Sequence, residues 1–329
     1  MAHRDIVVIG ASRGALTVLK KLVAGLAPDL DATVCIVLHI GRHHSILPEL
    51  LSRAGPLKAS HPQQGERMER GRIYVAPPDR HMVVREGKLR LLDTAAENFA
   101  RPAADPLFRS AAAEYRKRVV GVVLSGDLDD GAAGLAAIRA RGGYAIVQHP
   151  DSSDAPSMPH SALAAVGADA VAGPDDLPHV LQAAVRGAET HEAHSMTDRP
   201  DLDREAQLGE CLRVLPEQLD EIGERSALTC PSCNGVLWRM YDERPLRYRC
   251  HTGHAFSSLT LEEASEQSAE DAIWSAIRAV HERLIFARER QRWAERAGND
   301  VEMALEQARI DENEKLAEIL RAATRVQVP

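Results

Sequence analysis

Continuous hydrophobic runs alternate with helical patterns over residues 1–187. The runs are rich in β-branched residues, as strands buried on both faces of a sheet are. They are Ile6–Ile9, Val34–Leu38, Val119–Leu124 and, with a weaker pattern, Tyr144–Val147. Hydrophobic residues recur at helical spacing over residues 15–26, 132–139 and 177–185. Strands that alternate with helices imply right-handed crossovers, so this region predicts a doubly wound, mainly parallel α/β domain.

One antiparallel element interrupts the predicted sheet. His81–Arg85 and Lys88–Leu92 are short runs of strand-forming residues, and Glu86 and Gly87 separate them. A two-residue connection that ends in glycine is typical of a tight hairpin turn. We therefore expect a small β-hairpin within the α/β domain.

The hydrophobic pattern stops after residue 187. Residues 188–207 contain six acidic side chains and two arginines, and Met196 and Leu202 are their only large hydrophobic residues. A segment that cannot bury enough apolar surface stays exposed. We expect a linker over residues 188–226, followed by a cysteine-rich module over residues 227–260.

Two further helical patterns follow the cysteine-rich module. The first hydrophobic stripe consists of Ile273, Ile277, Val280 and Leu284. The second consists of Val301, Leu305, Ala308, Leu316 and Ile319. Gly298, Asn299 and Asp300 separate them, which predicts a helical hairpin over residues 261–325 with one stripe on each helix. These stripes, together with Trp274 and Trp293, either pack on each other or serve a helical partner or a second copy of the chain.

Composition and charge exclude several classes of protein. The 329 residues include 48 acidic and 40 basic side chains, a formal net charge of −8, which argues against nucleic-acid binding. No hydrophobic stretch approaches the roughly 18 residues of a membrane helix, and Met1–Asp5 lacks the features of a signal peptide. The five cysteines, three of them close together, favour a reducing cytoplasm and a metal site over a disulfide framework.

A serine stands between two glycines where the first predicted strand meets the first helix. In the segment Gly10–Gly14, a sharp turn exposes the hydroxyl of Ser12 beside the free N–H groups at the helix start, which suit an oxyanion. The G-x-S-x-G pattern is that of a nucleophile elbow. A plain turn is one alternative. A dinucleotide-binding loop is another, but it requires glycine at the positions of Ser12 and Ala15.

Two more polar positions follow predicted strands. His39 ends the second strand, and the third strand leads into Ser125–Gly134, which holds three aspartates and three glycines. The carboxyl ends of parallel strands meet at one edge of a sheet, where ligands bind. A histidine at such a place is more often structural, and aspartates also form metal or phosphate loops or helix caps. Serine, histidine and aspartate together can carry out acyl transfer.

Six blocks of residues, in order, resemble the CheB methylesterases, which demethylate chemoreceptors. The blocks are Ile9–Ser12, His39, Tyr74–Met82, Arg101–Phe108, Leu124–Gly134 and Met158–Pro159. The resemblance implies that Ser12 is the nucleophile, His39 the general base and Asp130 the carboxylate that orients the base. It also implies hydrolysis of glutamate γ-methyl esters, with methanol as the leaving group, and glutamine deamidation by the same acyl chemistry.

The chain departs from the family pattern beside the serine and in the third loop. Arg13–Ala15 stands where the family usually has Thr-Gly-Gly, and Asp127 stands where methionine is common. The resemblance implies that backbone N–H groups near Arg13 and Asp127 bind the oxyanion. A carboxylate beside a developing negative charge opposes catalysis unless a cation neutralises it, so we expect Arg13 to pair with Asp127. Other polar residues of this domain have no expected catalytic role: His43, His44, His61, His81 and Arg101.

Four residues of the cysteine-rich module predict a metal site: Cys230, Cys233, Cys250 and His254. Sixteen residues separate the CxxC pair from the C-x-x-x-H pair, and each pair has a glycine beside it or within it. This spacing fits a tetrahedral Cys₃His zinc ribbon. Four protein ligands leave no open position for chemistry, so the predicted zinc is structural. His251 is a competing fourth ligand, and a CxxC redox pair is the other interpretation.

These features together predict a cytoplasmic serine esterase with a C-terminal zinc ribbon and helical hairpin. The resemblance implies that its substrate is a methylated chemoreceptor or a similar helical protein, and that a methyltransferase or another signalling protein is a further partner. Because the first strand starts close to Asp5, we expect no phosphorylatable receiver domain before it. We expect the ribbon and hairpin to act as a docking or regulatory module instead. Two alternatives are a non-catalytic signalling scaffold and a nucleotide-binding module.

Overall fold

The structure, a computed structural model, describes residues 3–39, 45–189, 200–211, 213–241 and 245–324. His43 and His44, and residues 190–199 of the expected linker, lie outside these ranges. The chain forms two compact units, Met1–Leu261 and Glu262–Pro329. The first unit holds the parallel sheet together with the cysteine-rich module, and the second holds most of the helical hairpin.

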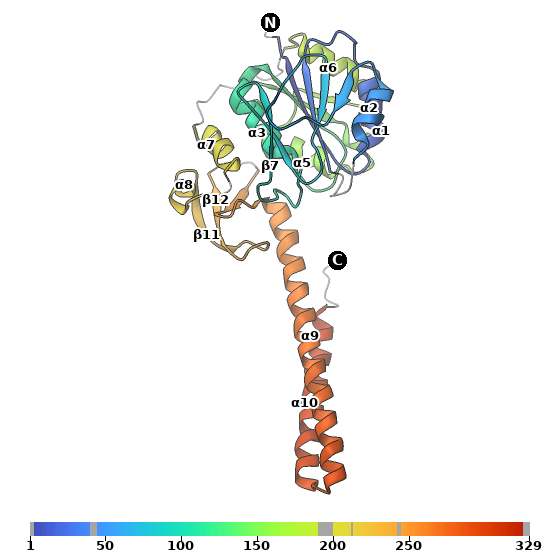
Figure 1. The fold of residues 1–329 in the computed structure, drawn as a ribbon, viewed down its shortest axis with the longest axis vertical. Coiled ribbons are helices and arrows are strands. Elements are labelled where there is room, and N and C mark those ends of the chain that lie inside the picture. The colour runs from blue at the N-terminus through green and yellow to red at the C-terminus, as the bar shows by residue number, and fades with distance from the viewer. Residues whose placement is uncertain (1–2, 40–44, 190–199, 212, 242–244, 325–329) are drawn as a thin grey trace. The chain divides into compact units, whose positions relative to one another are not determined.

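The core of the first unit is a seven-stranded parallel sheet (Figure 1). Its strands lie in the order β10 (Ala170–Ala172), β9 (Tyr144–Gln148), β8 (Val119–Val123), β1 (Ile6–Ala11), β2 (Thr33–Leu38), β5 (Arg72–Val75) and β3 (Lys58–Ser60). The chain therefore winds outward from β1 in both directions, which confirms the predicted doubly wound α/β fold. As a result, the carboxyl ends of β1, β2 and β8 lie side by side at the point where the strand order reverses.

Helices cover both faces of this sheet. One face carries α1 (Ala15–Ala24), α2 (Leu47–Ala54) and α6 (Leu177–Val185). The other carries α3 (Ala104–Tyr115), α4 (Ala132–Ala140) and α5 (Ser157–Val166). Neighbouring residues of a strand point to opposite faces, so Ile9 joins the first hydrophobic cluster and Val8 the second. Burial on both faces explains why the strands are continuous hydrophobic runs.

The predicted hairpin is confirmed. β6 (His81–Arg85) pairs antiparallel with β7 (Lys88–Leu92), and β4 (Glu66–Arg67) completes a small three-stranded sheet. Glu86 and Gly87 both have a positive φ, 51° and 70°, as the two central residues of a tight I′ turn do. Residues 93–103 then lead from β7 to α3 along the rim of the parallel sheet.

Composition predicts an exposed linker over residues 188–226, and the described part of residues 200–226 contains regular secondary structure. They contain α7 (Pro200–Gly209), α8 (Pro216–Asp220) and the start of β11 (Gly223–Thr229). Glu205 of α7 is buried because it pairs with Arg247, 42 residues further along the chain. The predicted division of the first unit into a domain over 1–187 and a separate ribbon over 227–260 stays a prediction.

The cysteine-rich module is a four-stranded antiparallel sheet. Its order is β11, β12 (Val236–Met240), β13 (Arg247–Cys250) and β14 (Ala255–Ser257). A hydrophobic cluster around Leu237, Phe256 and Leu261 includes Cys230 and Cys250. The sheet thus surrounds the cysteines with apolar side chains on one side.

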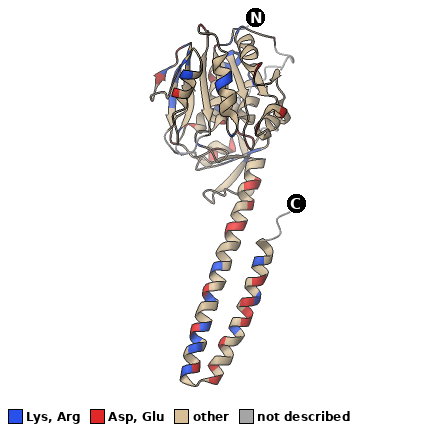
Figure 2. Ribbon diagram, turned by 90° about the vertical axis from the view of Figure 1, so that its right-hand side faces the viewer, with Lys and Arg blue, Asp and Glu red and all other residues tan. Residues whose placement is uncertain are grey.

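The second unit is the predicted helical hairpin. α9 (Ser258–Ala297) and α10 (Asp300–Thr324) are joined at Gly298 and Asn299. Acidic and basic residues are distributed along both helices (Figure 2). On α9, Ile277 and Val280 of the predicted stripe are buried. None of the helices within the described ranges has both the length and the hydrophobicity that a bilayer span requires.

The stripe predicted on α10 is wrong. Four of its five members are exposed: Val301, Leu305, Ala308 and Ile319. The helix instead buries Glu306, Ile310, Asn313 and Ala317, which recur at helical spacing on another face. Arg290 of α9 forms an ion pair with Glu306, and this contact selects the more polar face. Trp274 and Trp293 are also exposed, so neither side chain is buried by packing between the two helices of the hairpin.

Candidate active site

The nucleophile candidate lies at the turn between β1 and α1. Gly14 precedes α1 with a φ of 77°, a conformation that glycine adopts without strain. The N–H of Ser12 donates to the carbonyl of Ser125 at 2.9 Å, which joins this turn to the loop after β8. Gly126 is required here, because a Cβ on it would lie 2.6 Å from the Cβ of Ser12. The two loops therefore meet directly behind the serine.

Ser12, His39 and Asp130 form a hydrogen-bonded relay. The Oγ of Ser12 lies 3.2 Å from Nδ1 of His39, and Nε2 of His39 lies 2.8 Å from Oδ2 of Asp130. An ionised carboxylate only accepts hydrogen bonds, so Nε2 carries the proton and Nδ1 is free to accept one from the serine hydroxyl. The three residues follow β1, β2 and β8, so the expected convergence at one sheet edge is present in the structure.

The carboxylate of Asp130 is buried at the start of α3. It accepts hydrogen bonds from the backbone N–H groups of Ala104, at 2.5 Å, and Asp105, at 3.2 Å. Burial by itself would raise the pKa of Asp130, but the hydrogen bond and charge of His39 and these N–H donors hold that pKa below its ordinary value. The carboxylate is therefore ionised at neutral pH and can stabilise a positive charge on His39.

Two N–H groups point to an anion site beside the serine. Within the described residues, the backbone N–H groups of Arg13 and Asp127 donate to no protein acceptor. The expected ion pair is present, since Nη2 of Arg13 lies 2.6 Å from Oδ1 of Asp127. Both side chains are largely exposed, so water and salt screen this pair. These donors have the chemistry that an oxyanion requires.

A cavity of about 490 Å³ lies in front of the relay. Its walls include Ser12, His39, Phe99, Asp127 and, from the ribbon, His254. Arg101 also lies on the rim, where its guanidinium donates to Asp79. His81 is buried away from the cavity, with its ring bonded to the backbone of Ala95 and Ala103, so it has a structural role.

Several groups of this site were not identified from the sequence. Asn98 donates to the carboxylates of Asp105 and Asp130, and Asp105 in turn accepts from the N–H of Gly134 at 2.6 Å. Burial and the neighbouring charge of Asp130 raise the pKa of Asp105 to about 7. The Arg101–Phe108 block contains Asp105 and was a usable signal, whereas nothing in the local pattern marks Asn98. His61 bonds to the carbonyl of Val75 and is not part of the site.

The Cys₃His cluster has the dimensions of a tetrahedral metal site. The ligand atoms of Cys230, Cys233, Cys250 and His254 all lie within 4.8 Å of one another. Sγ of Cys233 is 3.7 Å from Sγ of Cys250, and Nδ1 of His254 is 3.7 and 3.6 Å from Sγ of Cys230 and Cys250. A zinc tetrahedron with Zn–S of about 2.3 Å and Zn–N of about 2.0 Å has edges of roughly 3.5–3.8 Å. The cluster can therefore bind a metal. His251 is exposed and is not one of the four.

A doubly wound sheet with serine, histidine and aspartate at its carboxyl edge is the arrangement of hydrolases that form an acyl-enzyme on serine. The sequence model of the CheB methylesterases matches residues 7–181, which is more than half of the chain. The chain therefore belongs to the CheB methylesterase family.

Known proteins agree with this assignment. A protein-glutamate methylesterase/protein-glutamine glutaminase of Anaeromyxobacter dehalogenans is 35% identical over 186 residues, which are 56% of this chain and 54% of the relative. A relative from Leptospira interrogans is 33% identical over 51% of this chain and 88% of its own length. The crystal structure of the Thermotoga maritima CheB methylesterase catalytic domain superimposes with a TM-score of 0.52 at 27% identity, covering 55% of this chain and 98% of that domain. The chain thus spans about half the length of the Anaeromyxobacter relative.

Proposed function

We propose that this chain is a serine carboxylesterase that hydrolyses glutamate γ-methyl esters on a protein substrate. The observation that carries the proposal is the relay in which Nδ1 of His39 faces Ser12 while Nε2 faces the buried carboxylate of Asp130. His39 takes the proton of Ser12 as its Oγ attacks the ester carbonyl. Asp130 stabilises the resulting imidazolium and fixes the ring.

The rest of the reaction follows from the same groups. The tetrahedral oxyanion is bound by the backbone N–H groups of Arg13 and Asp127. His39 then returns its proton to the methoxy group, and methanol leaves the acyl-enzyme. A water then attacks the acyl carbon as His39 takes one of its protons. His39 returns this proton to Oγ of Ser12 as the acyl bond breaks, and the released glutamic acid loses the other proton to solvent to become the carboxylate. A glutamine side chain can follow the same path with ammonia as the leaving group, which makes deamidation a side activity.

The proposed substrate is a methylated chemoreceptor or a similar helical protein, which membership of the CheB family implies. The names of the relatives give protein glutamate and glutamine as the groups acted on. The cavity in front of Ser12 opens between loops rather than inside the sheet, which suits a side chain presented on a protein surface. We place the enzyme in the cytoplasm, where its thiols stay reduced. A methyltransferase or another signalling protein is a proposed further partner, and the exposed Trp274 and Trp293 of the hairpin offer apolar contacts for a helix.

The proposed metal is a structural zinc held by Cys230, Cys233, Cys250 and His254. Three of the distances between ligand atoms match the edges of a zinc tetrahedron, and all four positions can be filled by protein ligands. In this proposal the zinc stabilises the fold of the ribbon and takes no part in hydrolysis.

A fluorophosphonate probe separates this proposal from its rivals. An activated serine attacks the phosphorus of the probe and displaces fluoride, which leaves a phosphonate ester. We therefore expect covalent labelling at Ser12 of the wild type and none in Ser12→Ala. Absence of labelling in a folded protein would instead support a non-catalytic scaffold. Saturable nucleotide binding would support a nucleotide-binding module.

A further inference from the structure

The loop between β7 and α3 is fastened to the ribbon along its backbone. Glu97 forms a parallel bridge with Ala255, and the N–H of Asn98 donates to the carbonyl of Ala255 at 2.9 Å. The ring of Phe99 packs edge-on against Phe256, with centroids 5.8 Å apart. Residues 97–99 and the strand β14 therefore form one continuous seam beside the cavity.

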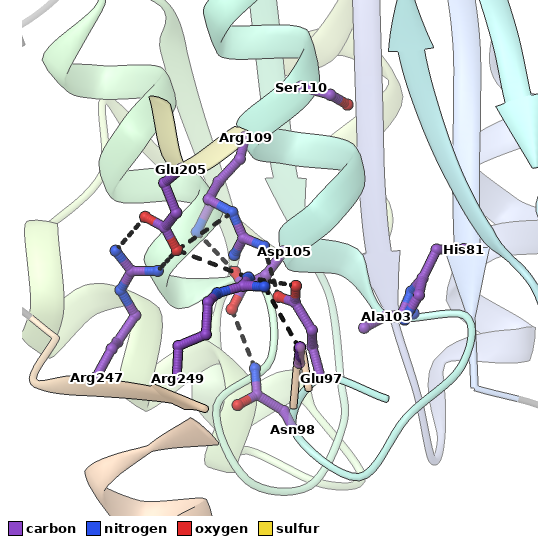
Figure 3. A network of polar contacts seen from close by, with 12 residues as sticks. His81, Glu97, Asn98, Ala103, Asp105, Arg109, Ser110, Glu205, Arg247 and Arg249 are labelled. Atoms are coloured by element: carbon purple, nitrogen blue, oxygen red, sulfur yellow. Dashed lines mark hydrogen bonds and ion pairs between the residues drawn. The ribbon is translucent and has the colours of Figure 1, made fainter. Parts of the chain in front are cut away.

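A buried network of ion pairs holds this seam in place (Figure 3). Glu97 accepts from Arg109 of α3 at 2.5 Å and from Arg249 of β13 at 2.6 Å. Glu205 of α7 binds Arg247 with both of its oxygens, at 2.5 and 2.7 Å. Burial would raise the pKa of Glu97, but the charges of Arg109 and Arg249 hold that pKa at about 2. Because all five side chains are buried, separating the ribbon would leave uncompensated charges.

The amide of Asn98 joins the ribbon to the relay. On one side its Nδ2 donates to Oδ2 of Asp105 at 3.0 Å and to Oδ1 of Asp130 at 3.3 Å. On the other side its Oδ1 accepts from the N–H of Ser257 at 3.1 Å and from the hydroxyl of Thr260 at 3.2 Å. The Nδ2 group of Asn98 faces only carboxylates, and its Oδ1 faces only hydrogen-bond donors. The amide therefore satisfies its partners in this orientation and not when its oxygen and nitrogen are exchanged.

The same short segment of the ribbon carries a member of the metal cluster. His254 directly precedes β14, and its carbonyl accepts from the N–H of Cys250 at 3.0 Å. Its ring belongs to the Cys₃His cluster and also lines the cavity. Residues 254–257 therefore connect the cluster at one end to the acceptor side of Asn98 at the other.

We propose that Asn98 is a positioning residue through which the metal-loaded ribbon holds Asp130 toward His39. The proposal rests on the esterase function proposed above. Three thiolates at these distances repel each other unless a cation joins them. Loss of the metal then releases the turn that carries His254, and Ser257 and Thr260 no longer fix the amide. Hydrolysis thereby depends on the metal content of the ribbon, although the metal takes no part in it.

Thr260 gives the sharpest test, because it contacts Asn98 but lies outside the relay. Thr260→Val removes the hydroxyl at nearly constant volume, and Thr260→Ser keeps it as the matched control. In the zinc-loaded full chain, we expect Thr260→Val to lower kcat about threefold to tenfold, with KM within about twofold of wild type. Thr260→Ser should restore the wild-type kcat. Asn98→Asp, which places a carboxylate against Asp130, should lower kcat about tenfold to hundredfold.

The second readout does not depend on turnover. The low-field proton resonance of Nε2–H of His39 reports its hydrogen bond to Asp130. This resonance should shift or broaden in Thr260→Val. It should also shift or broaden when a chelator removes the metal from wild type, under conditions in which the amide signals of the parallel sheet are retained. In the stripped wild type, the resonance should return when zinc is added. If Thr260→Val fails to fold, Asn98→Asp supplies the same comparison.

The proposal would be overturned if zinc-loaded Thr260→Val and Asn98→Asp both show the kcat and the resonance of wild type. It would also be overturned if wild type without its metal keeps its kcat and its resonance. Because the resonance is independent of ester hydrolysis, it distinguishes a failure of this coupling from a failure of the proposed esterase function.

Discussion

The guanidinium of Arg13 lies 2.6 Å from the carboxylate of Asp127, so this ion pair joins the loop after β1 to the loop after β8. Asp127 stands where family members commonly carry methionine, so its charge is a departure that needs a partner. Arg13, another departure, supplies that partner. The ion pair therefore places a positive charge beside the carboxylate of Asp127.

Removal of Arg13 should leave the negative charge of Asp127 without its neutralising partner. Arg13→Ala leaves the carboxylate of Asp127 beside the proposed oxyanion, so we expect kcat to fall about twofold to fivefold, the range of an exposed ion pair. Adding Asp127→Met to this variant should recover the loss. Lys21→Ala, which breaks the exposed pair with Asp175, is the matched control and should leave kcat unchanged. The pairing idea is wrong if Arg13→Ala retains full kcat while Asp127→Met alone raises it.

The buried network predicts a large stability effect. Arg249 is 2% exposed and pairs with Glu97, so Arg249→Met leaves part of a buried charge unpaired. We expect the free energy of unfolding, measured in urea, to fall by about 3–5 kcal/mol. Arg239→Met, which breaks an exposed pair with Glu224 in the same sheet, should cost less than about 1 kcal/mol. Equal losses in the two variants would contradict a buried network.

Asp105 predicts a pH dependence of stability. Its folded pKa is raised to about 7, whereas the ordinary value is 3.8. A group with a raised folded pKa stabilises the fold fully below its unfolded pKa, and this contribution is lost as the pH rises through the folded pKa. The unfolding free energy should therefore decline between about pH 4 and pH 7, and Asp105→Asn should reduce that decline.

The exposed Asp151 supplies the control for this measurement. Urea unfolding at several pH values should give Asp151→Asn the same slope as wild type. An unchanged slope in Asp105→Asn would show that another group causes the decline.

The cysteine cluster predicts the metal content of the protein. Freshly purified wild type should contain one zinc per chain by elemental analysis, and Cys250→Ser should lose most of it. Cys211 is exposed and lies outside the cluster, so Cys211→Ser should retain the metal. A zinc content near zero in the wild type would exclude the proposed ribbon site.

The sequence predicts most of the parallel sheet and the convergence of the relay. Strands buried on both faces produce continuous hydrophobic runs, and the carboxyl edge of a parallel sheet collects the residues that follow them. Strand order alone thus places Ser12, His39 and the loop Ser125–Gly134 at one edge, whereas the choice of Asp130 among the three aspartates of that loop depends on the resemblance to the family. Glu86 and Gly87 likewise define the hairpin by local turn chemistry alone.

The remaining features depend on contacts between distant polar residues. Glu205 makes its helix look exposed by composition, yet Arg247 allows it to be buried. On α10, Glu306 replaces the more hydrophobic Leu305 at the interface because Arg290 pairs with it. Asn98 has no local signal, since its importance arises from four partners on four segments: α3, the loop after β8, β14 and α9. The periodicity of hydrophobic residues indicates which apolar side chains are buried, but it does not indicate which charged side chains are buried as pairs.

The central claim is that Ser12 is the nucleophile of a glutamate methylesterase. Its most direct test is the release of methanol from a methylated receptor fragment by the zinc-loaded full chain, measured for wild type, Ser12→Ala and the control Ser226→Ala on β11. The account predicts saturable release by wild type and Ser226→Ala, and a rate at least about a thousandfold lower for Ser12→Ala. Equal release by wild type and Ser12→Ala would contradict it.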